Sequence, residues 1–139
     1  MSYSIRGTQY YRAHVADRPE EAYELLNGLA DLGINLLAFT ATPTGPNHVQ
    51  LTLFPEDAGR LESEAKRAGL TVEGPHPAIL VQGDDELGAL AKVHRALADA
   101  SVAIYTSSGV TDGKGSFGYV IYVREDQYGR AMEALAGAG

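Results

Sequence analysis

The chain has 139 residues, which is enough for one ordinary domain or two very small ones. Its net charge of −7 and its 11 scattered basic residues argue against nucleic acid as a partner, because such affinity comes from Lys and Arg displacing counterions. The lack of cysteine excludes disulfides and thiolate chemistry, and no segment has the roughly 18 uninterrupted apolar residues of a membrane span. We therefore expect a cytoplasmic protein that binds neither nucleic acid nor membrane.

The sequence repeats itself at a constant spacing. The tripeptide Leu-Ala-Asp occurs at residues 29–31 and again at residues 97–99. The same shift, without a gap, aligns Gly45 with Gly113 and places similar apolar residues opposite one another along both segments. A constant shift held over the whole segment indicates a duplication, so each copy can be used to interpret the other.

Each copy begins with a predicted strand followed by a helix. The strands are expected over residues 10–17 and 78–85, and each ends in an acidic residue that suits a helix N-cap. In the first copy Asp17 would be the cap, Pro19 would lie in the first turn and Glu20 would complete a capping box. Apolar residues then recur at helical spacing: Ala22, Leu25, Leu26 and Leu29 in the first copy, and Leu90, Val93 and Leu97 in the second.

Two strands and a second helix follow in each copy. Gly33 fits the C′ position that ends the first helix. Strands are expected over residues 34–42 and 102–110, and the next strands show clean alternation: Val49, Leu51 and Leu53, then Phe117, Tyr119, Ile121 and Val123. The second helix is predicted to start near Asp57 in the first copy and near Asp126 in the second.

The final strand distinguishes the two copies. Residues 70–74 predict it in the first copy, whereas the second copy stops at Gly139 without one. Its place would be empty, or be filled by residues 2–7 or by another chain, because unpaired sheet edges are normally covered. We expect an α+β fold of two units, residues 1–74 and 75–139, with antiparallel sheets and helices on one face.

These residues together resemble ACT domains, the small amino-acid-sensing modules attached to many metabolic enzymes. The second copy carries "DELGALAKV" at residues 85–93, similar to the family phrase "DxPGALAKV", with Leu87 in place of Pro and Gly88 kept. The first copy keeps Pro19 but has Glu20 where the family usually has Gly. The resemblance covers roughly residues 8–137 and implies a stand-alone tandem ACT protein of two ferredoxin-like βαββαβ units.

The resemblance implies that a free amino acid binds at an interface between two ACT units. The family's contacts come from the loop after the first strand, the first turn of the helix and the start of the second strand. The matching positions are Asp17, Arg18, Pro19, Glu20 and Asn35 in the first copy, and Asp85, Glu86, Leu87, Gly88, Ala89, Thr106 and Ser107 in the second. The position of Asn35 is occupied by Ala103 in the second copy, so equivalent binding in both copies is not expected.

The chemistry of these residues suits a zwitterion. A helix N-terminus offers backbone N–H groups to a carboxylate, and Gly88 would let a ligand approach that backbone. Asp17, Asp85 and Asn35 could accept an ammonium group, although the two aspartates could equally be N-caps and Asn35 could satisfy local backbone. One hypothesis places a single ligand between unlike copies, with Asn35 from one and the Gly88 loop from the other.

No catalytic residue, metal site or cofactor is predicted. The four histidines lack metal-ligand spacing, and the glycine-rich residues 107–118 lack the P-loop pattern. The predicted function is a non-catalytic regulatory protein that binds a small molecule, an amino acid in the first place, as a homodimer and with a metabolic enzyme as a further partner. The alternatives are a regulatory subunit of an enzyme such as acetolactate synthase, a small ferredoxin-like enzyme, and a pairing module without a ligand.

Overall fold

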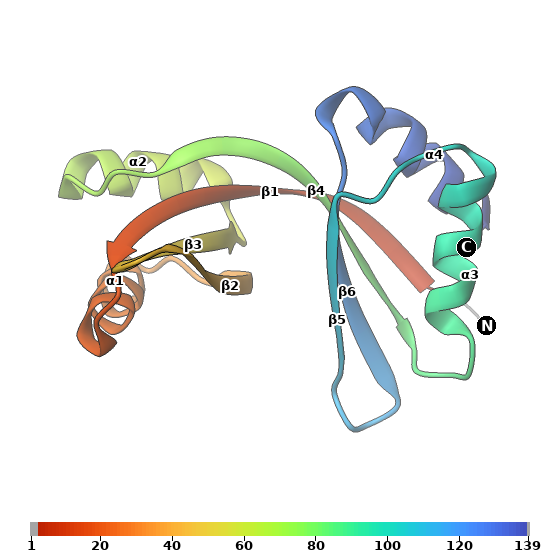
Figure 1. Ribbon diagram of the computed structural model, residues 1–139, viewed down its shortest axis with the longest axis horizontal. Helices are drawn as coiled ribbons and strands as arrows, with labels where there is room; N and C mark the ends of the chain where they lie inside the picture. The colour runs from red at the N-terminus through yellow and green to blue at the C-terminus, as the bar shows by residue number, and fades with distance from the viewer. Residues whose placement is uncertain (1–2, 139) are drawn as a thin grey trace. The chain divides into compact units, whose positions relative to one another are not determined.

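The computed structural model describes residues 3–138, which form six strands and four α-helices (Figure 1). In chain order the elements are β1 (Tyr3–Ala16), α1 (Pro19–Asp31), β2 (Leu36–Gly45), β3 (His48–Pro55), α2 (Ala58–Ala68), β4 (Glu73–Asp84), α3 (Ala89–Asp99), β5 (Thr106–Thr111), β6 (Ser116–Tyr122), a 3-10 turn η1 (Glu125–Gln127) and α4 (Tyr128–Ala138).

The elements form two compact units. The first unit is Gln9–His76, and the second unit is Pro77–Gly139 together with Met1–Thr8. The long strands β1 and β4 each contribute residues to both units (Figure 1). This division by contacts differs from the expected ranges 1–74 and 75–139, because the first residues of the chain pack with the second copy of the repeat.

The six strands form one antiparallel sheet in the order β2-β3-β1-β4-β6-β5. The first unit uses its part β2-β3-β1-β4, and the second unit uses its part β1-β4-β6-β5. Taken from the start of each copy, both orders are the 4-1-3-2 order of a ferredoxin-like βαββαβ unit. The predicted α+β fold class is therefore confirmed.

The start of β1 occupies the position of the strand that the second copy lacks. Tyr3 and Ile5 pack against the core of the second unit. The Tyr3 hydroxyl donates to the Leu135 carbonyl at 3.1 Å, and the Ser4 hydroxyl donates to the Gln82 carbonyl at 3.4 Å. Residue 2, the first of the predicted segment, lies outside the described residues.

The helices of each unit cover one face of its sheet. In the first unit, buried residues of α1 and α2 pack on β1 and β3: Leu29, Leu61 and Ala65 on Tyr11, Ala13, Leu51 and Leu53. In the second unit, α3 and α4 pack on β4 and β6: Val93, Leu97, Ala131 and Leu135 on Ile79, Val81, Phe117, Tyr119 and Ile121. Of the residues named at helical spacing, Leu29, Val93 and Leu97 are buried, whereas Leu90 is exposed.

Several local expectations were wrong. Residues 70–74 and 78–85 do not form two strands, because β4 runs unbroken from Glu73 to Asp84. The end of β3 is not half-exposed, because Thr52 and Phe54 are buried and the Tyr10 ring lies 5.4 Å from the Phe54 ring. β5 begins at Thr106, four residues later than expected.

The helix starts show which predicted caps are formed. Asp57 caps α2, since its carboxylate accepts from the Arg60 backbone N–H at 3.1 Å. Asp17 does not cap α1, whose N-cap is Arg18 without a side-chain hydrogen bond. Asp85 does not cap α3 either, because Gly88 occupies the N-cap position.

The repeated Leu-Ala-Asp sequence ends the first helix of each copy in the same way. Gly33 has φ +74° after α1, and Ile34 N–H donates to the Leu29 carbonyl at 2.9 Å. After α3, Ser101 has φ +57° and Val102 N–H donates to the Leu97 carbonyl at 2.9 Å. Both corners are Schellman motifs, but the second places a residue with a Cβ in the left-handed region.

We expect Ser101→Gly to raise the free energy of unfolding by about 0.5–1 kcal/mol, because glycine adopts a positive φ without steric cost. The matched change Gly33→Ser should lower it by a similar amount at the equivalent corner. Urea unfolding followed by circular dichroism measures both. The two changes are expected to be similar in size and opposite in sign. A destabilised Ser101→Gly variant would contradict the left-handed conformation assigned to residue 101.

Candidate functional site

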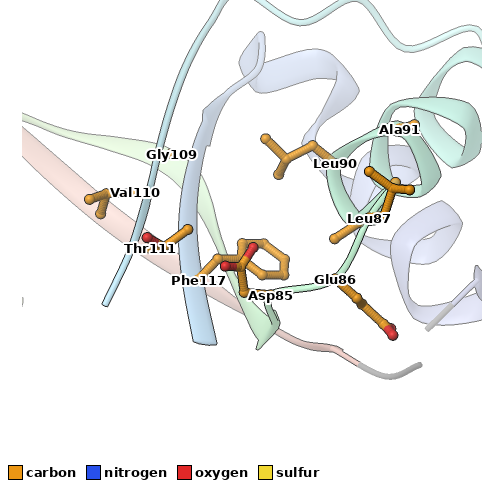
Figure 2. Close-up of a pocket in the computed structure, with 11 residues that line it drawn as sticks. Asp85, Glu86, Leu87, Leu90, Ala91, Gly109, Val110, Thr111 and Phe117 are labelled. Carbon is orange, nitrogen blue, oxygen red and sulfur yellow. The ribbon is translucent and has the colours of Figure 1, made fainter. Parts of the chain in front are cut away.

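A cavity of about 630 Å³ lies in the second unit, between the β4–α3 loop and β5 (Figure 2). Residues 85–88 of the loop and residues 89–91 in the first turn of α3 form one wall. Residues 109–111 of β5 form the other wall, with Phe117 of β6 between them. All of the lining residues belong to the second unit.

The loop wall is shaped by Gly88, which has φ +83° at the N-cap of α3. Asp85 N–H donates to the Gly115 carbonyl at 2.8 Å, and Ala89 N–H donates to the Glu86 carbonyl at 3.0 Å. These bonds turn the chain tightly from the end of β4 into α3. A glycine suits this position because the left-handed conformation carries no Cβ penalty.

The N-terminus of α3 presents backbone donors to the cavity. The N–H groups in the first turn of a helix have no carbonyl partner within the helix. The N-cap residue Gly88 has no side chain to cap α3, and the first-turn residues Leu90 and Ala91 both line the cavity. This end of the helix therefore offers donors and a partial positive charge to an anionic group.

Apolar side chains form much of the cavity surface. Leu87 is fully exposed, and Leu90 and Val110 are 41% and 74% exposed. Figure 2 shows Leu90 reaching from α3 toward β5. The Val110 side chain points to the side of β5 that faces away from Leu90, so Leu87 and Leu90 are the large exposed apolar side chains at this cavity (Figure 2). Such exposed apolar surface is typical of a site that binds an apolar group.

The charged side chains that line the cavity are acidic. Asp85 and Glu86 both line the cavity, and the Glu86 carboxylate points away from β5 (Figure 2). No basic side chain lines the cavity. The side chains therefore favour a cationic group near Asp85, while the helix N-terminus favours an anionic group a few residues further on.

The structure brings together five of the seven positions named in the second copy. Asp85, Glu86, Leu87, Gly88 and Ala89 all line the cavity. The other two, Thr106 and Ser107, lie at the start of β5, before the residues of this strand that line the cavity. The Thr106 hydroxyl donates to the Tyr105 carbonyl at 2.9 Å, and Ser107 accepts from Tyr119 at 2.7 Å.

The sequence reasoning missed the apolar part of the cavity. Leu90 was assigned to the core from its helical spacing, but the buried residue at the start of α3 is Ala89. Val110 was taken only as the end of a strand. The missed lining residues are Leu90, Ala91, Gly109, Val110, Thr111 and Phe117.

The positions named in the first copy have local partners. Arg18 lies 3.8 Å from Glu20 and 3.5 Å from Glu21, and Pro19 begins α1. Asn35 donates through Nδ2 to the Glu56 carboxylate at 3.1 Å, and its carbonyl accepts from Glu56 N–H at 2.9 Å. A ligand shared by Asn35 and the Gly88 loop stays a prediction.

The described residues contain neither a candidate metal site nor a candidate membrane-spanning helix. Within residues 3–138, no group of three or more histidine, aspartate or glutamate side chains is arranged to hold a metal ion. None of the helices in the same part of the chain has the length and apolar character needed to cross a membrane.

Comparison with known proteins establishes the fold. No family model and no curated protein matches this chain. Among solved structures, protein BT0572 from Bacteroides thetaiotaomicron is 18% identical, with a TM-score of 0.81 over 96% of this chain and 89% of that chain. The regulatory subunit of aspartate kinase from Thermus flavus is 16% identical, with a TM-score of 0.62 over 99% of this chain and 97% of that chain. The chain thus has the ACT-type fold that the resemblance implied.

We expect Leu97→Ala to lower the free energy of unfolding by about 2–4 kcal/mol, because it empties space in a close-packed core. Leu90→Ala should change it by less than about 1 kcal/mol, because Leu90 is a partly exposed cavity wall. Urea unfolding of the two variants measures the difference. If Leu90→Ala lowered the free energy of unfolding as much as Leu97→Ala does, Leu90 would have to be a core residue.

Proposed function

We propose that the chain is a non-catalytic regulatory protein that binds an amino acid in the cavity at the N-terminus of α3. The observation that carries the proposal is the uncapped helix end facing an exposed apolar wall. The likeness in fold to the regulatory subunit of aspartate kinase supports a regulatory role.

The cavity offers a complementary group for each part of an amino acid. The ligand carboxylate is placed at the N–H groups of Leu90 and Ala91. Its ammonium group is placed at the Asp85 carboxylate. Its side chain lies against Leu87 and Leu90, which favours amino acids with aliphatic or aromatic side chains over charged ones.

A second copy of the chain is the proposed partner at β5. β5 is the edge strand of the second unit, and its six residues carry neither charge nor proline and pair with β6 in regular register. The edge strand of the first unit, β2, contains Pro43 and has register shifts at both ends, devices that discourage edge pairing. A homodimer through β5 would place the partner next to the cavity wall.

A role as the regulatory chain of a metabolic enzyme is the second candidate. It is favoured by the likeness to two aspartate kinase regulatory subunits, from Thermus flavus and from Thermus thermophilus, which are similar over nearly their whole length. Acetolactate synthase is a comparable enzyme partner. Co-purification of an enzyme with the tagged chain from its native cells tests this candidate.

A melting screen against the twenty common L-amino acids tests the ligand. A ligand at one hundred times its Kd adds about 2.7 kcal/mol, which raises the Tm of a chain of this size by several degrees. We expect the largest rise with an aliphatic or aromatic amino acid. No response to any of the twenty would contradict amino-acid binding.

We expect Leu87→Asp to abolish the melting response, because it adds a third carboxylate and removes apolar surface from the cavity wall. The stability of the free protein should change by less than about 0.5 kcal/mol, since Leu87 is fully exposed. Tyr23→Asp is the matched control, because Tyr23 is a large exposed side chain on α1 of the first unit. An unchanged response in Leu87→Asp would place the ligand elsewhere.

We expect Ser108→Lys on β5 to convert the dimer to a monomer, because a lysine at a strand edge opposes pairing with an identical edge. Thr40→Lys on β2 is the control and should leave the dimer intact. Sedimentation velocity measures both variants. A parent protein that sediments as a monomer, or a dimer that survives Ser108→Lys, would exclude pairing through β5.

A further inference from the structure

One buried side chain connects the two walls of the cavity. Tyr119 of β6 is 5% exposed and belongs to the core of the second unit. Its hydroxyl donates to Ser107 Oγ on β5 at 2.7 Å, and His94 Nε2 on α3 lies 2.5 Å from the same oxygen. The direction of the second bond depends on the tautomer of the His94 ring.

The Tyr119 ring also supports β5 at the cavity. Gly109 and Tyr119 are partners in the β5–β6 register. A Cβ on Gly109 would lie 2.8 Å from Cδ1 of the Tyr119 ring, closer than real contacts allow. The backbone of Gly109, which lines the cavity, therefore rests directly on the ring.

β5 has few other restraints toward the helix. It is an edge strand, and its backbone ladder is formed with β6. The Tyr119 side chain forms hydrogen bonds to both α3 and β5. His94 lies one turn after Leu90 on α3, so the bond at His94 restrains the same helix face that carries Leu90.

We propose that Tyr119 is a positioning residue whose hydroxyl holds β5 against α3 and so fixes the width of the cavity. The effect on ligand binding rests on the proposed function, whereas the spacing between α3 and β5 does not depend on it. Tyr119→Phe keeps the ring that supports Gly109 and removes both hydrogen bonds, which makes it the informative change.

Amide hydrogen exchange followed by NMR, without ligand, tests the spacing. We expect Tyr119→Phe to speed exchange at residues 106–111 about ten-fold, the equivalent of about 1.4 kcal/mol, with little change in α4 or in the first unit. His94→Ala should have the same local effect, and His94→Gln, which keeps an N–H donor, should restore slow exchange. Tyr3→Phe is the matched control, because it loses one hydroxyl bond in the same unit, to Leu135.

Titration with L-leucine as the probe tests the consequence for binding. Tyr119→Phe is expected to raise the Kd about ten-fold, and Tyr3→Phe to leave it unchanged. Exchange in Tyr119→Phe that is unchanged at β5, or that rises evenly through the second unit, would overturn the positioning role. A parent protein that does not bind L-leucine counts against the proposed ligand alone, since the exchange measurement still decides the role of Tyr119.

Discussion

The pairing of the first residues of β1 with β4 is the constraint on which the second unit depends. It brings Tyr3 and Ile5 to the core and places β4 inside the sheet instead of at an edge. The loop of residues 85–88 leaves from the end of β4, so the position of the cavity wall follows from this pairing. The same strand continues into the first unit, where Tyr11 and Ala13 lie in the other core. The strand β1 thus contributes residues to both units.

The candidate site combines local backbone chemistry with packing around it. Gly88 occupies the N-cap position of α3 and has no side chain to cap it, so the N–H groups of Leu90 and Ala91 are left for a ligand in the proposed site. Leu87 and Leu90 add apolar surface that folding leaves exposed, which has a stability cost that a bound apolar group would remove. Tyr119 joins the two walls from behind through His94 and Ser107. The equivalent helix start of the first copy carries Pro19 and Glu20, where Arg18 already pairs with the acidic side chains.

The sequence predicted a helix or strand correctly where its apolar residues follow one periodicity and therefore lie on one face of the element. The spacing of Val93 and Leu97 and the alternation of β6 identified core residues, and the second helix of the first copy was correctly predicted to start near Asp57. Prediction failed where a residue type serves two purposes. Asp17 and Asp85 were equally suitable as caps and as strand ends, and the chain used Arg18 and Gly88 at the N-cap positions. Leu90 fits helical spacing, but the small Ala89 fills the buried position.

The repeat in the sequence was sufficient to predict the fold class and the element order, because these follow from patterns within about twenty consecutive residues. The loop of the candidate site was implied by the resemblance to ACT domains. The corner after each Leu-Ala-Asp could be recognised in both copies for the same reason, even though Ser101 replaces glycine. Which strand completes the second sheet, and which apolar residues remain exposed around the cavity, depend on contacts between residues far apart in the chain. Tyr3 and Leu135, or Leu90 and Val110, carry no mutual signal in the sequence, so only folding brings them to the same core or the same cavity.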